Sequence, residues 1–73
     1  MKQEENKMKW YENRNPYTGE TCWWTQRDKN GNCFEIRKAQ ASKQLHLFVN
    51  ETYKSTHDTL IEAQQIAAPL WNR

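Results

Sequence analysis

The feature that most restricts the fold of this chain is an Asn30-Gly31 pair between two runs rich in aromatic and β-branched residues, 20–27 and 33–39. An Asn-Gly pair in this setting is typical of a two-residue hairpin turn, because both residues adopt positive φ readily. The two runs are therefore predicted to form an antiparallel hairpin whose turn is Asn30-Gly31.

A turn at this position also fixes which residues lie opposite each other. Trp24 is expected opposite Arg37, which predicts a cation–π contact worth about 0.5–1 kcal/mol at an exposed site. Cys22 and Cys33 are then several residues apart along the two strands, so we expect no disulfide between them. Two free thiols, with no secretion signal visible at the start of the chain, are typical of a cytoplasmic protein.

Three further strands are indicated on either side of this hairpin. The segment Asn15-Pro16-Tyr17-Thr18-Gly19 has the composition of a turn and separates a short strand at 10–14 from the one that begins at residue 20. The apolar run 45–49 and the segment 52–55 flank a two-residue turn at 50–51, which predicts a second hairpin.

The last part of the chain has the clearest helix start. Thr59 and Glu62 form a capping box, in which the Thr59 hydroxyl accepts from the amide of Glu62 and the Glu62 carboxylate reaches back to the amide of Thr59. Pro69 is expected to end the helix. The apolar stripe of this helix consists of Leu60, Ala63, Ala67 and either Leu70 or Trp71.

These elements predict a small α+β domain: an antiparallel β-meander of four to five strands with one C-terminal α-helix packed on one face. Residues 1–9 are mostly polar and are expected to be a disordered tail, and residues 10–73 to be a single domain. A chain of 73 residues buries only about 60% of its unfolded surface, so the core is thin.

One helix can cover only one side of such a sheet. The aliphatic side, which includes Ile36, Leu45 and Leu47, is the better partner for the helix. The other side, where Ser55 is also expected, is then left uncovered, unless Trp10-Tyr11 or Trp71 folds over it or its rings serve stability alone. The residues predicted to bind a partner on this side are Trp24, Arg37, His46, Phe48 and Tyr53.

A contiguous group of aromatic and arginine side chains is typical of protein-binding surfaces. We therefore expect a non-enzymatic protein-binding module, with Trp24, Phe48 and Tyr53 as apolar anchors and Arg37 and His46 for polar specificity. Small chains of this kind are typical of bacteriophages and other mobile elements, which use them to modulate a host protein. A homodimer through the same face is a further alternative.

The alternative function is weak DNA or RNA binding through the same face. Residues 33–68 resemble, in the order of their elements and in no specific motif, the arm-type DNA-binding domains of phage integrases, which lay a sheet on the major groove. Aromatic side chains could also stack on single-stranded bases. The net charge of +2 and the pI near 8.6 argue against this alternative, because domains that bind nucleic acid usually have a pI above about 9.

Other classes of function find little support in the sequence. The candidate metal ligands Cys22, Cys33, His46 and His57 do not form the close pairs that zinc sites use, and the two glycines cannot make a phosphate-binding loop. A Cys22–His46 catalytic pair would require a favourable strand offset. We expect no enzymatic activity, no cofactor and no metal, and no apolar run is long enough to cross a membrane.

Overall fold

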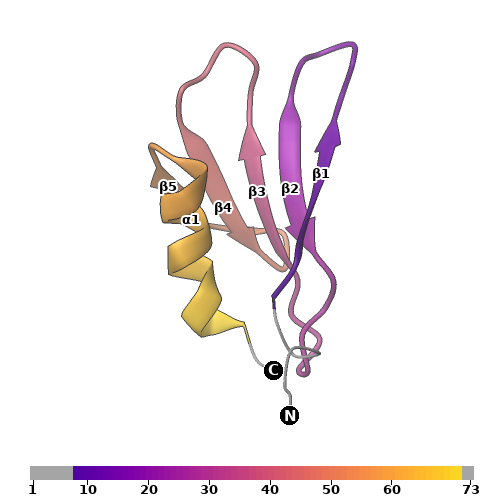
Figure 1. Ribbon diagram of the computed structural model, residues 1–73, viewed down its shortest axis with the longest axis vertical. Coiled ribbons are helices and arrows are strands. Elements are labelled where there is room, and N and C mark those ends of the chain that lie inside the picture. Colours follow the sequence, from indigo (N-terminus) through magenta and orange to yellow (C-terminus); the bar gives the residue numbers. More distant parts are fainter. Residues whose placement is uncertain (1–7, 72–73) are drawn as a thin grey trace.

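The computed structural model describes residues 8–71 and contains one five-stranded antiparallel sheet with a helix at its C-terminal end (Figure 1). The strands lie in the sheet in the order in which they occur in the chain, so every connection joins neighbours. The predicted α+β meander with a C-terminal helix is confirmed. The elements are β1 (Trp10–Arg14), β2 (Thr21–Thr25), β3 (Phe34–Lys38), β4 (Leu45–Val49), β5 (Thr52–His57), α1 (Leu60–Ala67) and the short 3-10 helix η2 (Ala68–Leu70).

The N-terminal tail predicted at residues 1–9 lies largely outside the described residues. At its end, Met8 is half-buried and packs against the core, and Lys9 lies over the ring of Tyr11 with its Nζ 5.5 Å from the ring centre. Met8 and Lys9 therefore contact the domain directly.

The first hairpin differs from its sequence prediction. The backbone N–H groups of Asn30 and Asn32 both donate to Oδ1 of Asp28, at 2.9 and 2.8 Å, and only Gly31 of the pair has positive φ. A longer loop organised by the buried Asp28 therefore replaces the two-residue turn.

This loop moves the strand register of the first hairpin by two residues. Trp24 lies opposite Glu35, and Arg37 lies opposite Cys22. The predicted pairing of Trp24 with Arg37 is wrong. Because side chains alternate with a period of two, the shift leaves every residue on the face that the sequence predicted.

The second hairpin has the turn at 50–51 that the sequence predicted. Asn50 and Glu51 have φ of 53° and 68°, and these two positive values are those of a type I′ turn. A β-bulge follows in β5, where Lys54 has no opposite residue, so Ser55 lies opposite Leu47 and Thr56 opposite His46. Tyr53 keeps its predicted face, but the expectation for Ser55 is wrong, because the extra residue turns it to the helix side.

The helix begins and ends where the sequence indicated. The amide of Glu62 donates to the Thr59 hydroxyl at 3.1 Å, and α1 ends two residues before Pro69, which is the second residue of η2. The Glu62 carboxylate accepts from the amide of Asp58, at 3.3 Å, rather than from that of Thr59. It also lies 3.4 Å from Nδ1 of His57, whose Nε2 is 2.7 Å from the Ser55 hydroxyl, so this chain of contacts ties the helix start to β5.

The core lies between α1 and the sheet. The helix packs on β3, β4 and β5, and Figure 1 shows it lying against this half of the sheet. Partly buried Trp10, Trp23 and Trp71 extend the same layer. Among residues 8–71 no helix is long and apolar enough to cross a membrane. The buried core residues are Phe34, Ile36, Leu45, Leu47, Ala63 and Ala67.

Candidate protein-binding face

The side of the sheet away from α1 carries two rows of side chains that run across all five strands. We call this side the open face. Directly opposite residues of antiparallel strands point to the same side, so the strand pairings define both rows. The first row is Tyr11, Trp24, Glu35, Phe48 and Tyr53, and the second is Asn13, Cys22, Arg37, His46 and Thr56.

At the β1 end of the first row, two aromatic rings stack on each other. The centroids of Tyr11 and Trp24 are 4.8 Å apart and their planes are inclined by 29°. Trp24 nevertheless remains 41% exposed, because nothing described in the structure covers its outer surface. The stack is thus a flat apolar platform open to solvent.

At the β5 end, a second ring cluster joins Phe48 and Tyr53. Their centroids are 6.0 Å apart in an edge-to-face arrangement, and Tyr53 is 56% exposed. The guanidinium carbon of Arg37 lies 4.2 Å from the centre of the Phe48 ring. The cation–π contact that the sequence assigned to Trp24 is therefore made with Phe48, the neighbour of Arg37 on β4.

The hydroxyl of Thr56 connects the two polar groups at this end of the face. It is 2.9 Å from Nδ1 of His46 and 2.7 Å from the Tyr53 hydroxyl. The bulge at Lys54 brings Thr56 to this position opposite His46. These contacts hold the His46 ring and the Tyr53 ring in fixed orientations before any partner binds.

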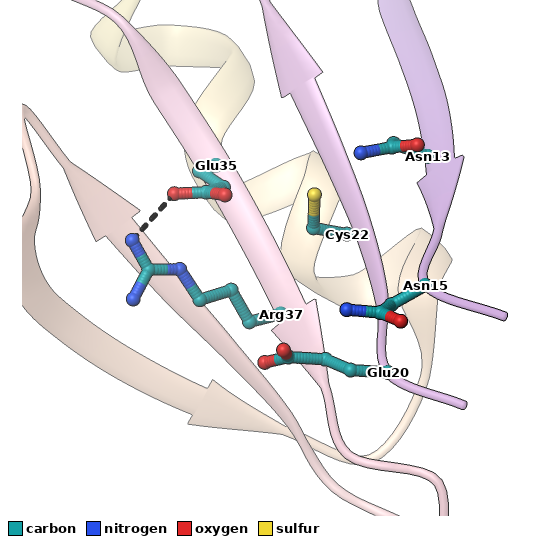
Figure 2. A pocket seen from close by; sticks show the side chains of 6 residues that line it. All are labelled: Asn13, Asn15, Glu20, Cys22, Glu35 and Arg37. Atoms are coloured by element: carbon teal, nitrogen blue, oxygen red, sulfur yellow. Dashed lines mark hydrogen bonds and ion pairs between the residues drawn. The ribbon is translucent and has the colours of Figure 1, made fainter. Parts of the chain in front are cut away.

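Over β1, β2 and β3, beside the stack of Tyr11 and Trp24, lies a hollow of about 290 Å³ (Figure 2). It forms where small residues of the second row, Asn13 and Cys22, stand beside the larger Arg37. In Figure 2 the amide groups of Asn13 and Asn15 point from the β1 side toward Cys22. The residues that line the hollow are Asn13, Asn15, Glu20, Cys22, Glu35 and Arg37.

The charged groups of the hollow are coupled. The guanidinium of Arg37 donates to Oε1 of Glu35 at 2.7 Å, which raises the pKa of Arg37 and keeps it charged. Burial raises the pKa of the Cys22 thiol; a hydrogen bond to Glu35 and the charges of Glu35 and Glu20 raise it further, against the opposing charge of Arg37. The thiol at the floor of the hollow is therefore neutral at physiological pH and a weak nucleophile.

All five residues predicted to bind a partner, Trp24, Arg37, His46, Phe48 and Tyr53, lie on the open face. Of the residues that were alternatives for covering it, Trp10 and Trp71 pack on the helix side with the core, whereas Tyr11 lies on the open face and stacks on Trp24. Sequence reasoning did not include Tyr11 among the binding residues and missed the hollow. Pairing the two strands on either side of the turn at residues 15–19 would have placed Tyr11 beside Trp24.

The residues considered for metal binding or catalysis are dispersed. Cys22 and Cys33 are free thiols, and Arg37 stands between Cys22 and His46 in the second row. His57 lies on the helix side, where it contacts Ser55 and Glu62. Within the described part of the chain, no group of three or more histidine, cysteine or acidic residues is placed to hold a metal ion.

No family model, curated protein or solved structure matches this chain.

Proposed function

We propose that the protein is a small non-enzymatic module that binds a protein partner in the cytoplasm through its open face. The observation that carries this proposal is the pair of exposed ring clusters, at Trp24 and at Tyr53, with Arg37 and His46 held between them. Tryptophan, tyrosine and arginine are the residues that contribute most at protein interfaces. Their fixed orientation lowers the entropy lost on binding.

The charges of the open face favour a protein over a nucleic acid. Its central cation, Arg37, is already paired with Glu35, and the carboxylates of Glu20 and Glu35 line the hollow. A phosphate backbone needs free cations and would be repelled by these carboxylates. An apolar protein surface needs no free cations and is not repelled by the carboxylates.

The hollow indicates the chemistry of the partner. Its two carboxylates exceed its single guanidinium, so it suits a side chain that donates hydrogen bonds and carries positive charge, such as lysine or arginine. The partner would lay apolar side chains on the two ring clusters and insert this donor into the hollow. By occupying the partner's surface in this way, the module would modulate a host protein, as we expect of a product of a bacteriophage or another mobile element.

The experiment is an affinity capture from a lysate of the cells that encode the chain, with Trp24→Ser and Tyr53→Ser beside the wild type. Ile61→Ser is the matched control, because Ile61 is an exposed apolar residue of α1, away from the open face. Each capture is repeated after nuclease treatment and at high salt.

The proposal requires a protein that the wild type and Ile61→Ser retain and the two open-face variants lose. Its retention should survive nuclease and change little with salt, because aromatic anchoring is weakly screened. Capture that disappears with nuclease or falls steeply with salt would support nucleic-acid binding instead. Capture that is indifferent to Trp24 and Tyr53, or no capture at all, would refute the proposal.

A further inference from the structure

The two edges of the sheet differ in how they are protected against pairing with another strand. At the β5 edge, the bulge at Lys54 interrupts the strand, and the contact of His57 with Glu62 places the helix start beside it. Bulges and lysines are common devices that prevent edge pairing. β1, at the opposite edge, pairs with β2 over all five residues without a register shift and contains no proline.

The direction of the backbone groups of β1 follows from one printed hydrogen bond. The amide of Asn15 donates to the carbonyl of Glu20 at 2.8 Å, so Asn15 faces β2. Hydrogen-bonding direction alternates along an antiparallel strand, so Tyr11 and Asn13 also face β2. The backbone groups of Trp10, Glu12 and Arg14 then point outward from the sheet edge, and within residues 8–71 β1 has no other neighbouring strand.

We propose that this edge binds a second copy of the chain, with the two β1 strands antiparallel and Asn13 opposite Asn13 of the second copy. Glu12 then lies directly opposite Arg14 of the second copy, and the two-fold axis repeats this pair. Both residues are exposed, and both have outward-facing backbone groups. The strand is therefore complementary to itself in charge and in hydrogen bonding.

Other symmetric registers fit less well. A pairing centred on Glu12 sets two carboxylates opposite each other, which destabilises a strand pair. A pairing centred on Tyr11 sets Trp10 opposite Glu12 of the second copy, so within β1 it makes no opposite-charge pair. Charge complementarity therefore selects the register centred on Asn13.

This dimer would double the open face. Opposite residues of an antiparallel pair point to the same side, so both helices lie on one side of the joined sheet and both open faces on the other. Asn13 lines the hollow and would lie at the two-fold axis, so the two hollows would be neighbours. The β1–β2 turn, with Tyr17 95% exposed, would lie beside the start of β1 of the second copy.

The test is sedimentation equilibrium from micromolar to millimolar concentration on the wild type, Arg14→Glu, Glu12→Arg and the double variant. In Arg14→Glu both opposite-charge pairs become like-charge pairs, and we expect the dissociation constant to rise at least about tenfold. The double variant exchanges the charges and should restore most of the affinity. Glu12 also accepts from the indole N–H of Trp23 at 3.1 Å, so Glu12→Gln, which keeps an acceptor, controls for that contact.

The dimer does not depend on the proposed function, and Tyr53→Ser separates the two. That variant should leave the dissociation constant unchanged, because Tyr53 lies on β5, at the opposite edge of the sheet from β1. A monomer at every concentration would overturn the inference. A dimer that Tyr53→Ser disrupts, or one that Arg14→Glu leaves intact, would do so as well.

Discussion

Consecutive residues of β4 lie in different environments on the two sides of the sheet. Leu47 is fully buried against α1, whereas Phe48, the next residue, lies half-buried on the open face with Arg37 over its ring. On the helix side, Ala63 and Ala67 allow the helix to approach the sheet closely, and aliphatic side chains fill the space. On the open face, rings contact each other and solvent.

This difference indicates separate roles for the two sides. The helix side supplies most of the apolar burial that stabilises a domain of this size. The open face gains only the weaker energies of ring pairs and one ion pair, which a partner can supplement without disturbing the core.

Truncation of adjacent residues on β4 should separate the two sides most strongly. Leu47→Ala should lower the free energy of unfolding by about 2–5 kcal/mol, because it leaves a cavity in the core. Phe48→Ala should lower it by about 1 kcal/mol, since the lost contacts are a ring edge and a cation–π pair. Urea unfolding followed by circular dichroism measures both, and equal losses would contradict the division.

Weakening the N-cap of α1 should lower the free energy of unfolding through the helix side of the sheet and leave the open face unchanged. Thr59→Ala removes the acceptor of the Glu62 amide and should lower the free energy of unfolding by about 1 kcal/mol. Thr59→Ser keeps a hydroxyl at the cap and is the matched control. Thermal unfolding of the two variants checks this expectation, and an unchanged midpoint in Thr59→Ala would show that the cap does not stabilise the helix.

The thiol in the hollow should report the charge of the open face. The raised pKa of Cys22 means that its alkylation by iodoacetamide at pH 8 is slower than in the urea-unfolded chain. Glu35→Gln removes the negative charge and replaces a carboxylate acceptor by a weaker, neutral amide, so the Cys22 pKa should fall and the rate should rise. Peptide mass spectrometry resolves Cys22 from Cys33, and a slower reaction in Glu35→Gln would contradict this account of the hollow.

The raised pKa of Cys22 also makes the free energy of unfolding depend on pH. A folded pKa above the unfolded one favours the native state while the thiol is protonated, so this contribution is present below the unfolded pKa and is lost as pH rises through the folded pKa. Cys22→Ser should therefore reduce the alkaline fall in stability, measured by urea unfolding across that pH range.

The sequence predicted the layers of this fold because they depend on the period of two in strands and on local caps. The alternation in 45–49 and the capping residue Thr59 act within a few positions, so they can be recognised without the rest of the chain. An error of two residues in the first hairpin did not change any face. The open face could therefore be predicted although its pairings could not.

The details that failed depend on which of two local hydrogen-bonding patterns forms, on an unpaired residue, or on contacts between strands. Asn30-Gly31 has the composition of a tight turn, but the carboxylate of Asp28 binds two amides of the loop and stabilises a longer form. The bulge at Lys54 leaves no mark in the local pattern and redirects Ser55 and Thr56. The hollow depends on side chains from β1, β2 and β3 together, so no single segment indicates it.

The most direct test of the central claim is solvent paramagnetic relaxation in the intact protein, measured by NMR on assigned side chains with a soluble gadolinium chelate. The claim is that one helix covers the aliphatic side and leaves the aromatic side open. We predict strong relaxation of the Trp24 indole and the Tyr53 ring, and little for Phe34, Ile36 and Leu47. Protection of Trp24 and Tyr53 as complete as that of Leu47 would contradict it.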